Sequence, residues 1–119
     1  EMHEKLLPLC QLVEKAIGFY PNNCLLNYYP DGESSMGLHS DATEELQAGT
    51  GVVIISLGAE RVIAFRNKAN KAVEHHYRMK SGGFLYMDQQ VQYEWLHAIP
   101  KQQHAAARMS LTFRLINTG

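Results

Sequence analysis

The sequence has few cysteines, little net charge and no long apolar run. Cys10 and Cys24 are the only cysteines among 119 residues and do not form a CxxC pair, so neither a zinc site nor a disulfide framework is indicated. A formal net charge of −1 lacks the strongly basic balance of a dedicated duplex nucleic-acid binder, although it does not exclude nucleic acid. No apolar run approaches the roughly 20 residues of a membrane helix, and the first residues of the sequence do not show the charged-then-apolar pattern of a secretory signal. We therefore expect an intracellular, cytoplasmic protein without membrane contact.

What is present predicts one mainly β domain over residues 1–119. From Glu4 to Phe19 apolar residues recur at three- and four-residue steps, which predicts an amphipathic helix that ends near Gly18 and Pro21. Segments rich in β-branched and aromatic residues then predict strands at Cys24–Tyr29, Gly51–Leu57, Val62–Arg66, Val73–Met79, Phe84–Met87, Tyr93–Ile99 and Ala107–Ile116. Seven or eight short strands after one helix indicate a β-sandwich or jelly roll.

The last predicted strand has two different faces, because residues two apart on a strand point to the same side. One face carries Arg108, Ser110, Thr112 and Arg114, and the other carries Met109, Leu111, Phe113 and Leu115. The apolar face is expected to pack against a core. The face with two arginines is expected to be exposed to solvent, as on an ordinary surface strand, unless an acidic group lies opposite it. By the same rule Asn27 and Tyr29 project together.

Two of the six histidines stand out as metal ligands. His39-Ser40-Asp41 offers an imidazole and a carboxylate from one backbone segment, and His97 lies in a predicted strand far along the chain. Two histidines and one carboxylate are the ligand set of non-haem Fe(II) oxygenases, which leaves coordination positions open for a co-substrate and O₂. An isolated HxD pair occurs by chance in many sequences. The other histidines, His3, His75, His76 and His104, are typical of surface or loop positions.

The order of these residues is more specific than any one of them. Asn27-x-Tyr29 precedes His39-x-Asp41, which is followed by His97 and by Arg108-x-Ser110-Leu111-Thr112-Phe113-Arg114. This order resembles the AlkB-like branch of the Fe(II)- and 2-oxoglutarate-dependent dioxygenases, over about Asn23 to Leu115. The resemblance implies a double-stranded β-helix, the jelly-roll core of that superfamily, with an N-terminal helix.

The resemblance also implies roles for individual residues. His39, Asp41 and His97 would hold the metal and form the catalytic centre. The residues that would bind 2-oxoglutarate are Asn27, Tyr29, Arg108, Ser110 and Arg114, of which Arg114 would also organise the site carboxylates. A planar guanidinium suits this task because it grips a carboxylate through two hydrogen bonds. The implied cofactors are Fe(II), 2-oxoglutarate and O₂, with ascorbate as reductant.

The reaction that the resemblance implies is oxidative demethylation of N-methylated bases in DNA or RNA, which releases formaldehyde, succinate and CO₂. The expected partner is a single-stranded nucleic acid, without an obligate protein partner. Nucleic-acid repair members of this branch carry a longer N-terminal extension that forms a lid over the base. We therefore expect residues 1–119 to be the catalytic domain of a longer chain that has this lid elsewhere or lacks it. Trp95, Tyr86 and Tyr93 belong either to the substrate mouth or, as is more common for strand aromatics, to the core.

Two other classes of function stay open. A 2-oxoglutarate-dependent hydroxylase of a small molecule or a protein side chain would use the same site, and the near-neutral charge favours it. A non-catalytic jelly-roll binding module would hold a structural ion, or none, at the same histidines. The sequence does not decide between DNA, RNA and small-molecule substrates, nor does it give the oligomeric state.

Overall fold

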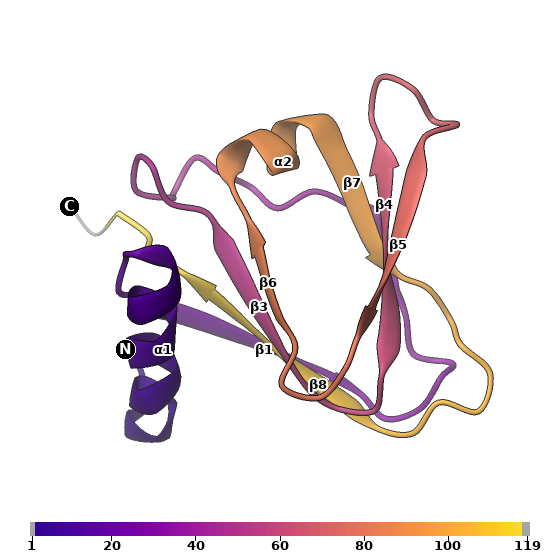
Figure 1. The fold of residues 1–119 in the computed structure, drawn as a ribbon, viewed down its shortest axis with the longest axis horizontal. Coiled ribbons are helices and arrows are strands. Elements are labelled where there is room, and N and C mark those ends of the chain that lie inside the picture. The colour runs from indigo at the N-terminus through magenta and orange to yellow at the C-terminus, as the bar shows by residue number, and fades with distance from the viewer. Residues whose placement is uncertain (1, 118–119) are drawn as a thin grey trace.

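Two four-stranded sheets face each other in the computed structural model, which describes residues 2–117 (Figure 1). The sheet orders are β1-β8-β3-β6 and β2-β7-β4-β5. The strands are β1 (Asn23–Tyr29), β2 (Met36–His39), β3 (Val52–Gly58), β4 (Arg61–Asn67), β5 (Glu74–Met79), β6 (Phe84–Met87), β7 (Trp95–Ile99) and β8 (Arg108–Arg114). All the strand pairs are antiparallel. The mainly β jelly roll predicted from the sequence is confirmed, and its strand count is within the expected range.

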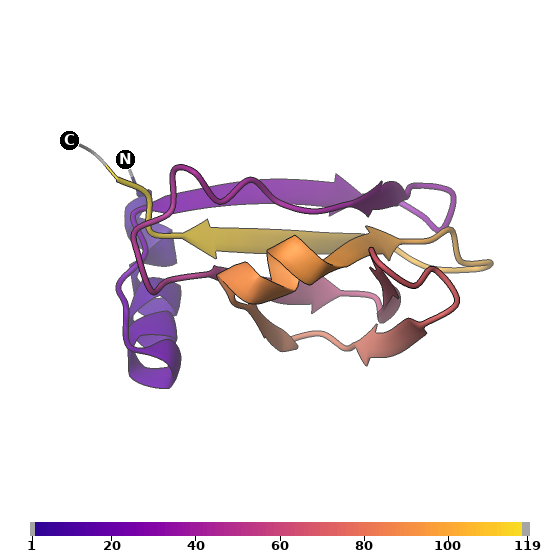
Figure 2. The same cartoon turned by 90° about the horizontal axis from the view of Figure 1, so that it is seen from above.

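The N-terminal helix lies against the outer face of the first sheet. A 3₁₀ turn, η1 (Glu4–Leu6), leads into α1 (Leu7–Ile17), and Gly18 ends the helix with a φ of 96°. That left-handed conformation suits glycine because it has no Cβ. Cys10 and Val13 are fully buried against the sheet. Figure 2 shows that the helix runs across the strands rather than along them. Within the described residues no helix is long and apolar enough to cross a membrane.

Strand β3 is buried on both faces, which explains its continuous apolar sequence. Val53 and Ile55 pack outward in the core beneath α1, whereas Val52 and Ile54 pack inward between the two sheets. Strand β8 lies beside β3 and follows the same division. Its apolar face, with Leu111 and Phe113, is therefore covered by the helix. The cationic face of β8 consequently points into the space between the sheets rather than to solvent.

Two elements differ from the sequence-based expectation. Strand β2 was not predicted, and a second helix, α2 (Gln89–Glu94), occupies the start of the segment predicted as strand from Tyr93. The strand there begins at Trp95 instead. Asp88 explains the helix, because its side chain accepts a hydrogen bond from the Val91 N–H and so caps the first turn. Six mostly polar residues carry too little apolar periodicity to show this helix in the sequence.

Candidate metal centre and adjoining cavity

The two metal-site histidines are direct cross-strand neighbours. His39 ends β2 and pairs with His97 of β7, and their ring centroids lie 4.3 Å apart. On its other side His97 pairs with Phe65 of β4, whose ring centroid lies 5.9 Å away. The sheet register therefore holds the His97 ring between an imidazole and a phenyl ring. This neighbourhood follows from the pairing of the strands, although β2 itself was missed in the sequence.

Asp41 completes a three-ligand cluster two residues beyond the end of β2. Its Oδ1 lies 3.7 Å from His39 Nε2, and its Oδ2 lies 3.7 Å from His97 Nε2. One ligand atom from each of the three residues lies within 4.8 Å of the others. His39 Nδ1 is 2.8 Å from the Gly37 carbonyl oxygen. Because a carbonyl only accepts, this contact favours the tautomer with the proton on Nδ1, in which the Nε2 lone pair faces the centre.

Burial prepares His97 to act as a neutral ligand. Its relative exposure is only 4%, and desolvation lowers its pKa below the ordinary value of 6.5. The Asp41 carboxylate opposes this shift of the pKa, and His39 reinforces it. A neutral imidazole is the form that binds a metal ion. At neutral pH the buried ring is therefore ready to coordinate.

A buried guanidinium lies at the other end of the same space. Arg108 is 2% exposed, and its Nε donates a hydrogen bond of 2.8 Å to Ser56 Oγ. Its guanidinium carbon lies 5.2 Å from the centroid of the Tyr29 ring, on the neighbouring strand. Burial is the largest cause that lowers the pKa of Arg108, and Arg61 adds to it. No carboxylate of residues 2–117 lies within ion-pair distance of Arg108.

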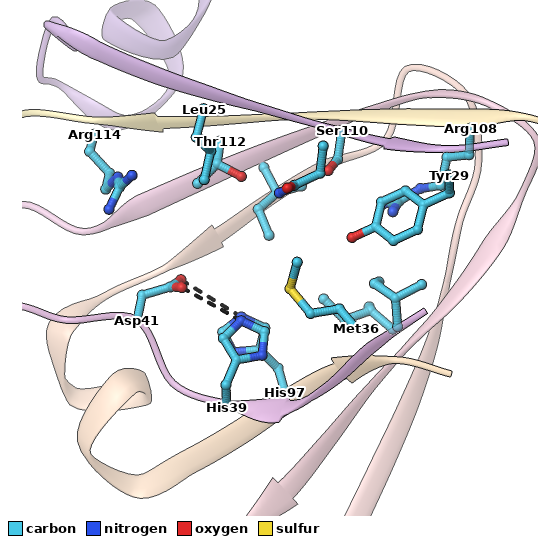
Figure 3. Close-up of a pocket in the computed structure, with 14 residues that line it drawn as sticks. Leu25, Tyr29, Met36, His39, Asp41, His97, Arg108, Ser110, Thr112 and Arg114 are labelled. Carbon is cyan, nitrogen blue, oxygen red and sulfur yellow. Dashed lines mark ion pairs between the residues drawn. The ribbon is translucent and has the colours of Figure 1, made fainter. Parts of the chain in front are cut away.

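One cavity of about 270 Å³ joins the metal cluster to this cationic end (Figure 3). Its polar lining consists of Asn27, Tyr29, His39, Asp41, His97, Arg108, Ser110, Thr112 and Arg114, and its apolar lining of Leu25, Met36, Ile54, Ile63 and Ile99. The structure thus brings together every residue that the sequence singled out for metal and co-substrate. The cavity has an open and a closed end, because the His39 and Asp41 side chains are 33% and 22% exposed whereas Arg108 is buried.

The unsatisfied polar atoms of this cavity match a small dicarboxylate. Arg108 Nη1 and Arg114 Nε are buried nitrogens without a hydrogen-bond partner in the described structure. A buried donor without a partner is costly, and a charged one more so. An anion that accepts from these donors would remove the cost. The His, Asp and His ligand set fits Fe(II), and the cationic end fits a carboxylate, so the residues suit both Fe(II) and 2-oxoglutarate.

Arg61 is a buried residue that the sequence analysis missed. It is fully buried at the start of β4 and donates to three backbone carbonyl oxygens, those of Asp31, Ser34 and Pro100, at 3.3, 2.9 and 2.8 Å. Its guanidinium carbon lies 5.6 Å from the centroid of the Tyr29 ring. The signal was its strand parity, because Arg61 alternates in phase with the core residues Ile63 and Phe65.

The aromatic residues considered for the substrate mouth are not part of this cavity. Trp95 and Tyr86 line a second cavity of about 370 Å³, together with Phe65, His75, Tyr77, Leu85, Met87 and Val91. Tyr93 is 65% exposed on α2. The exposed position of His75 and His76 on β5 agrees with the surface role expected for them. His104 lies in a turn, also as expected.

Comparison with known sequences adds family information to this geometry. A family model described as the 2OG-Fe(II) oxygenase superfamily matches residues 1–114. The DNA oxidative demethylase ALKBH2 of Bos taurus is 32% identical over 103 residues, which cover 80% of this chain and 37% of that protein. The alpha-ketoglutarate-dependent dioxygenase alkB homolog 3 of Rattus norvegicus is 31% identical over 113 residues, covering 87% and 38%. This chain thus spans less than two fifths of the length of these two curated relatives.

Comparison with solved structures supports the fold. OsALKBH1 superposes with a TM-score of 0.68 at 18% identity, over 92% of this chain and 61% of that one. The WlaRB TDP-quinovose 3,4-ketoisomerase from Campylobacter jejuni superposes with a TM-score of 0.55 at 13% identity, over 89% of this chain and 72% of that one. At such identities the likeness concerns the fold alone. A ketoisomerase shares this architecture, so function has to be argued from the site.

Proposed function

This chain belongs to the 2OG-Fe(II) oxygenase superfamily and is AlkB-like, and we propose that it is a dioxygenase that demethylates N-methylated bases in single-stranded DNA or RNA. One observation carries the proposal. A single cavity has three potential metal-ligating side chains at its open end and an unpaired cationic donor, Arg108 Nη1, at its closed end. That arrangement suits a co-substrate that chelates a metal at one end and needs a carboxylate anchor at the other.

Each residue of the cavity has a part in this reaction. His39, Asp41 and His97 would hold Fe(II), which supplies the activation of O₂ when bound. Arg108 and Tyr29 would anchor the terminal carboxylate of 2-oxoglutarate at the buried end, with Asn27 and Ser110 as further donors. Arg114 lies at the other end of β8, on the Asp41 side of the cavity (Figure 3), and would organise the site carboxylates. The apolar lining excludes water from the co-substrate. Because His39 and Asp41 are partly exposed, the methyl group would approach from solvent past these two side chains.

The stoichiometry balances with these components. One oxygen atom of O₂ enters succinate as 2-oxoglutarate loses CO₂, and the other converts the N-methyl group into a hydroxymethyl group. The N–C bond then breaks, which releases formaldehyde and returns a proton to the base nitrogen. Ascorbate would only keep the iron reduced.

A hydroxylase of a small molecule or a protein side chain is the second candidate. The observation that favours it is the charge beside the open end, where Glu44 and Glu45 are both exposed shortly after Asp41. Negative side chains at a mouth repel the phosphates of a nucleic acid. Such a hydroxylase would use the same metal and co-substrate site.

Succinate and formaldehyde would be measured with Fe(II), 2-oxoglutarate, ascorbate and a methylated single-stranded oligonucleotide. The demethylase proposal expects formaldehyde that depends on the oligonucleotide and disappears in His39→Ala. His76→Ala is the matched control, because this histidine is 57% exposed and lies on β5. Succinate without formaldehyde would select the second candidate. If neither product formed, both would be rejected.

A further inference from the structure

A buried amide contacts the metal-site carboxylate from outside the cluster. Gln92 lies on α2 and is only 2% exposed, although glutamine is usually found at the surface. It belongs to neither the ligand set nor the lining of the cavity described above. A buried polar side chain persists in a folded protein when hydrogen bonds satisfy it. The partners of Gln92 therefore indicate its role.

Both ends of the Gln92 amide contact one residue, Asp41. Gln92 Oε1 accepts a hydrogen bond of 2.8 Å from the Asp41 backbone N–H, and Gln92 Nε2 lies 3.5 Å from Asp41 Oδ2. A weaker contact of 3.8 Å joins Nε2 to Met87 Sδ. The first bond fixes the orientation of the amide, because only its oxygen accepts from an N–H. The amide nitrogen must then face the carboxylate.

Asp41 needs such an anchor because no strand holds it. Strand β2 ends at His39, and Asp41 follows in a segment without regular structure. Gln92, in contrast, lies on a helix whose backbone is anchored by Lys68. Lys68 Nζ donates a 2.7 Å hydrogen bond to the Gln92 carbonyl oxygen, and the Lys68 backbone N–H donates a 2.9 Å bond to the Glu94 carbonyl oxygen. These bonds tie α2 to the turn that follows β4.

We infer that Gln92 is a positioning residue that orients the Asp41 carboxylate for metal binding, an inference that rests on the function proposed above. Because the Gln92 amide N–H contacts Asp41 Oδ2, the other carboxylate oxygen, Oδ1, is freer to bind a metal ion. A carboxylate held in this way would present one oxygen to a metal ion rather than two, which would leave more coordination positions for other ligands. Residues that hydrogen-bond to metal ligands typically contribute roughly 10- to 100-fold to metal affinity or activity.

The test is Mn(II) binding to metal-free protein, measured by calorimetry without co-substrate. Gln92→Met keeps the side-chain length but removes both polar contacts with Asp41. The dissociation constant of this variant for Mn(II) should therefore be roughly 10- to 100-fold higher than that of the wild type. Gln90→Met is the matched control, because Gln90 lies on the same helix and its amide bonds to Glu94. Equal Mn(II) affinity in Gln92→Met and Gln90→Met would overturn the inference. If the wild-type protein bound no Mn(II), the function proposed above would fail instead.

A second variant separates orientation of the carboxylate from simple anchoring of the segment. Gln92→Glu keeps an acceptor for the Asp41 N–H but replaces the donor that faces Oδ2 with a carboxylate oxygen. We expect the Co(II) absorption spectrum of this variant to differ from that of the wild type, whereas Gln90→Glu leaves the spectrum unchanged. Superimposable Co(II) spectra for Gln92→Glu and the wild type would mean that Gln92 only anchors the segment. This comparison also decides the question if Gln92→Met does not fold.

Discussion

Replacing Arg108 by methionine should weaken 2-oxoglutarate binding while it stabilises the ligand-free protein. Methionine nearly matches the length of the arginine stem and removes the guanidinium. Hydrogen bonds to charged groups contribute about 1.5–3 kcal/mol each. Losing a two-bond grip on a buried carboxylate therefore costs about 3–5 kcal/mol, in line with the loss of one partner of a buried ion pair. At 1.4 kcal/mol for each factor of ten, affinity should fall roughly 100- to 4,000-fold.

The stability of the ligand-free protein should change in the opposite direction. Without an anion, Arg108 is buried with an unpaired Nη1, and burial lowers its pKa, which reflects the cost of desolvating its charge. Replacing a buried ion pair with apolar side chains of similar volume is often stabilising, by about 1–4 kcal/mol, and a buried charge without a partner is more costly than a paired one. The lost hydrogen bond to Ser56 offsets about 1 kcal/mol of that gain. A small net increase in the free energy of unfolding remains.

Two measurements decide this prediction. Calorimetry of 2-oxoglutarate binding to the Mn(II)-loaded protein gives the affinity, and urea unfolding of the ligand-free protein gives the stability. Arg78→Met is the control, because the Arg78 side chain is 78% exposed and should affect neither quantity. If Arg108→Met weakened 2-oxoglutarate binding and also destabilised the ligand-free protein, the reasoning would be refuted. The guanidinium would then build the site rather than grip the co-substrate.

Three further predictions concern the metal, the pH dependence and the backbone. His39→Ala should abolish Mn(II) binding in calorimetry, whereas retained binding would exclude His39 as a ligand. Because folding lowers the pKa of His97, the unfolded chain takes up a proton at a higher pH than the folded protein does. The free energy of unfolding of the metal-free protein, measured with urea, should therefore decrease as the pH falls below 6.5. This decrease should be smaller in His97→Gln. Gly32→Ala would overlap the Gln102 carbonyl oxygen and should destabilise the protein by about 1–3 kcal/mol, while Gly37→Ala, with no atom within 4 Å, should not; equal unfolding midpoints would contradict this.

Local patterns in the sequence predicted most of the fold. The β-branched and aromatic segments gave seven of the eight strands, and Gly18 marked the end of the helix. Strand β2 was missed because Met36-Gly37-Leu38-His39 is short and contains a glycine, which weakens its strand signal. It forms because β7 pairs with it. That pairing is a tertiary interaction and leaves no local pattern.

Some residues of the candidate site could be predicted from local sequence patterns, whereas others depend on tertiary contacts. Alternation along β8 predicted that Arg108 and Arg114 share a face, and both line the cavity. Gln92 could not be found, because its importance depends on a contact with Asp41 across 51 positions of sequence. Arg61 differs, because the sequence itself shows it as a charge in phase with the apolar residues of β4. The roles of these residues in metal and co-substrate binding stay predictions.

The pairing of His39 with His97 also affects the mechanics of the sheet. Strand β2 has four residues, lies at the edge of its sheet and pairs only with β7, through an irregular register. A metal ion held by both histidines would act as a cross-link between these strands, and because the unfolded chain lacks the assembled site, the binding free energy would add to the stability of the folded state. The ion would then stabilise the outermost strand of the sheet. Amide hydrogen exchange in β2 should slow when metal binds, while the central strand β3 changes little.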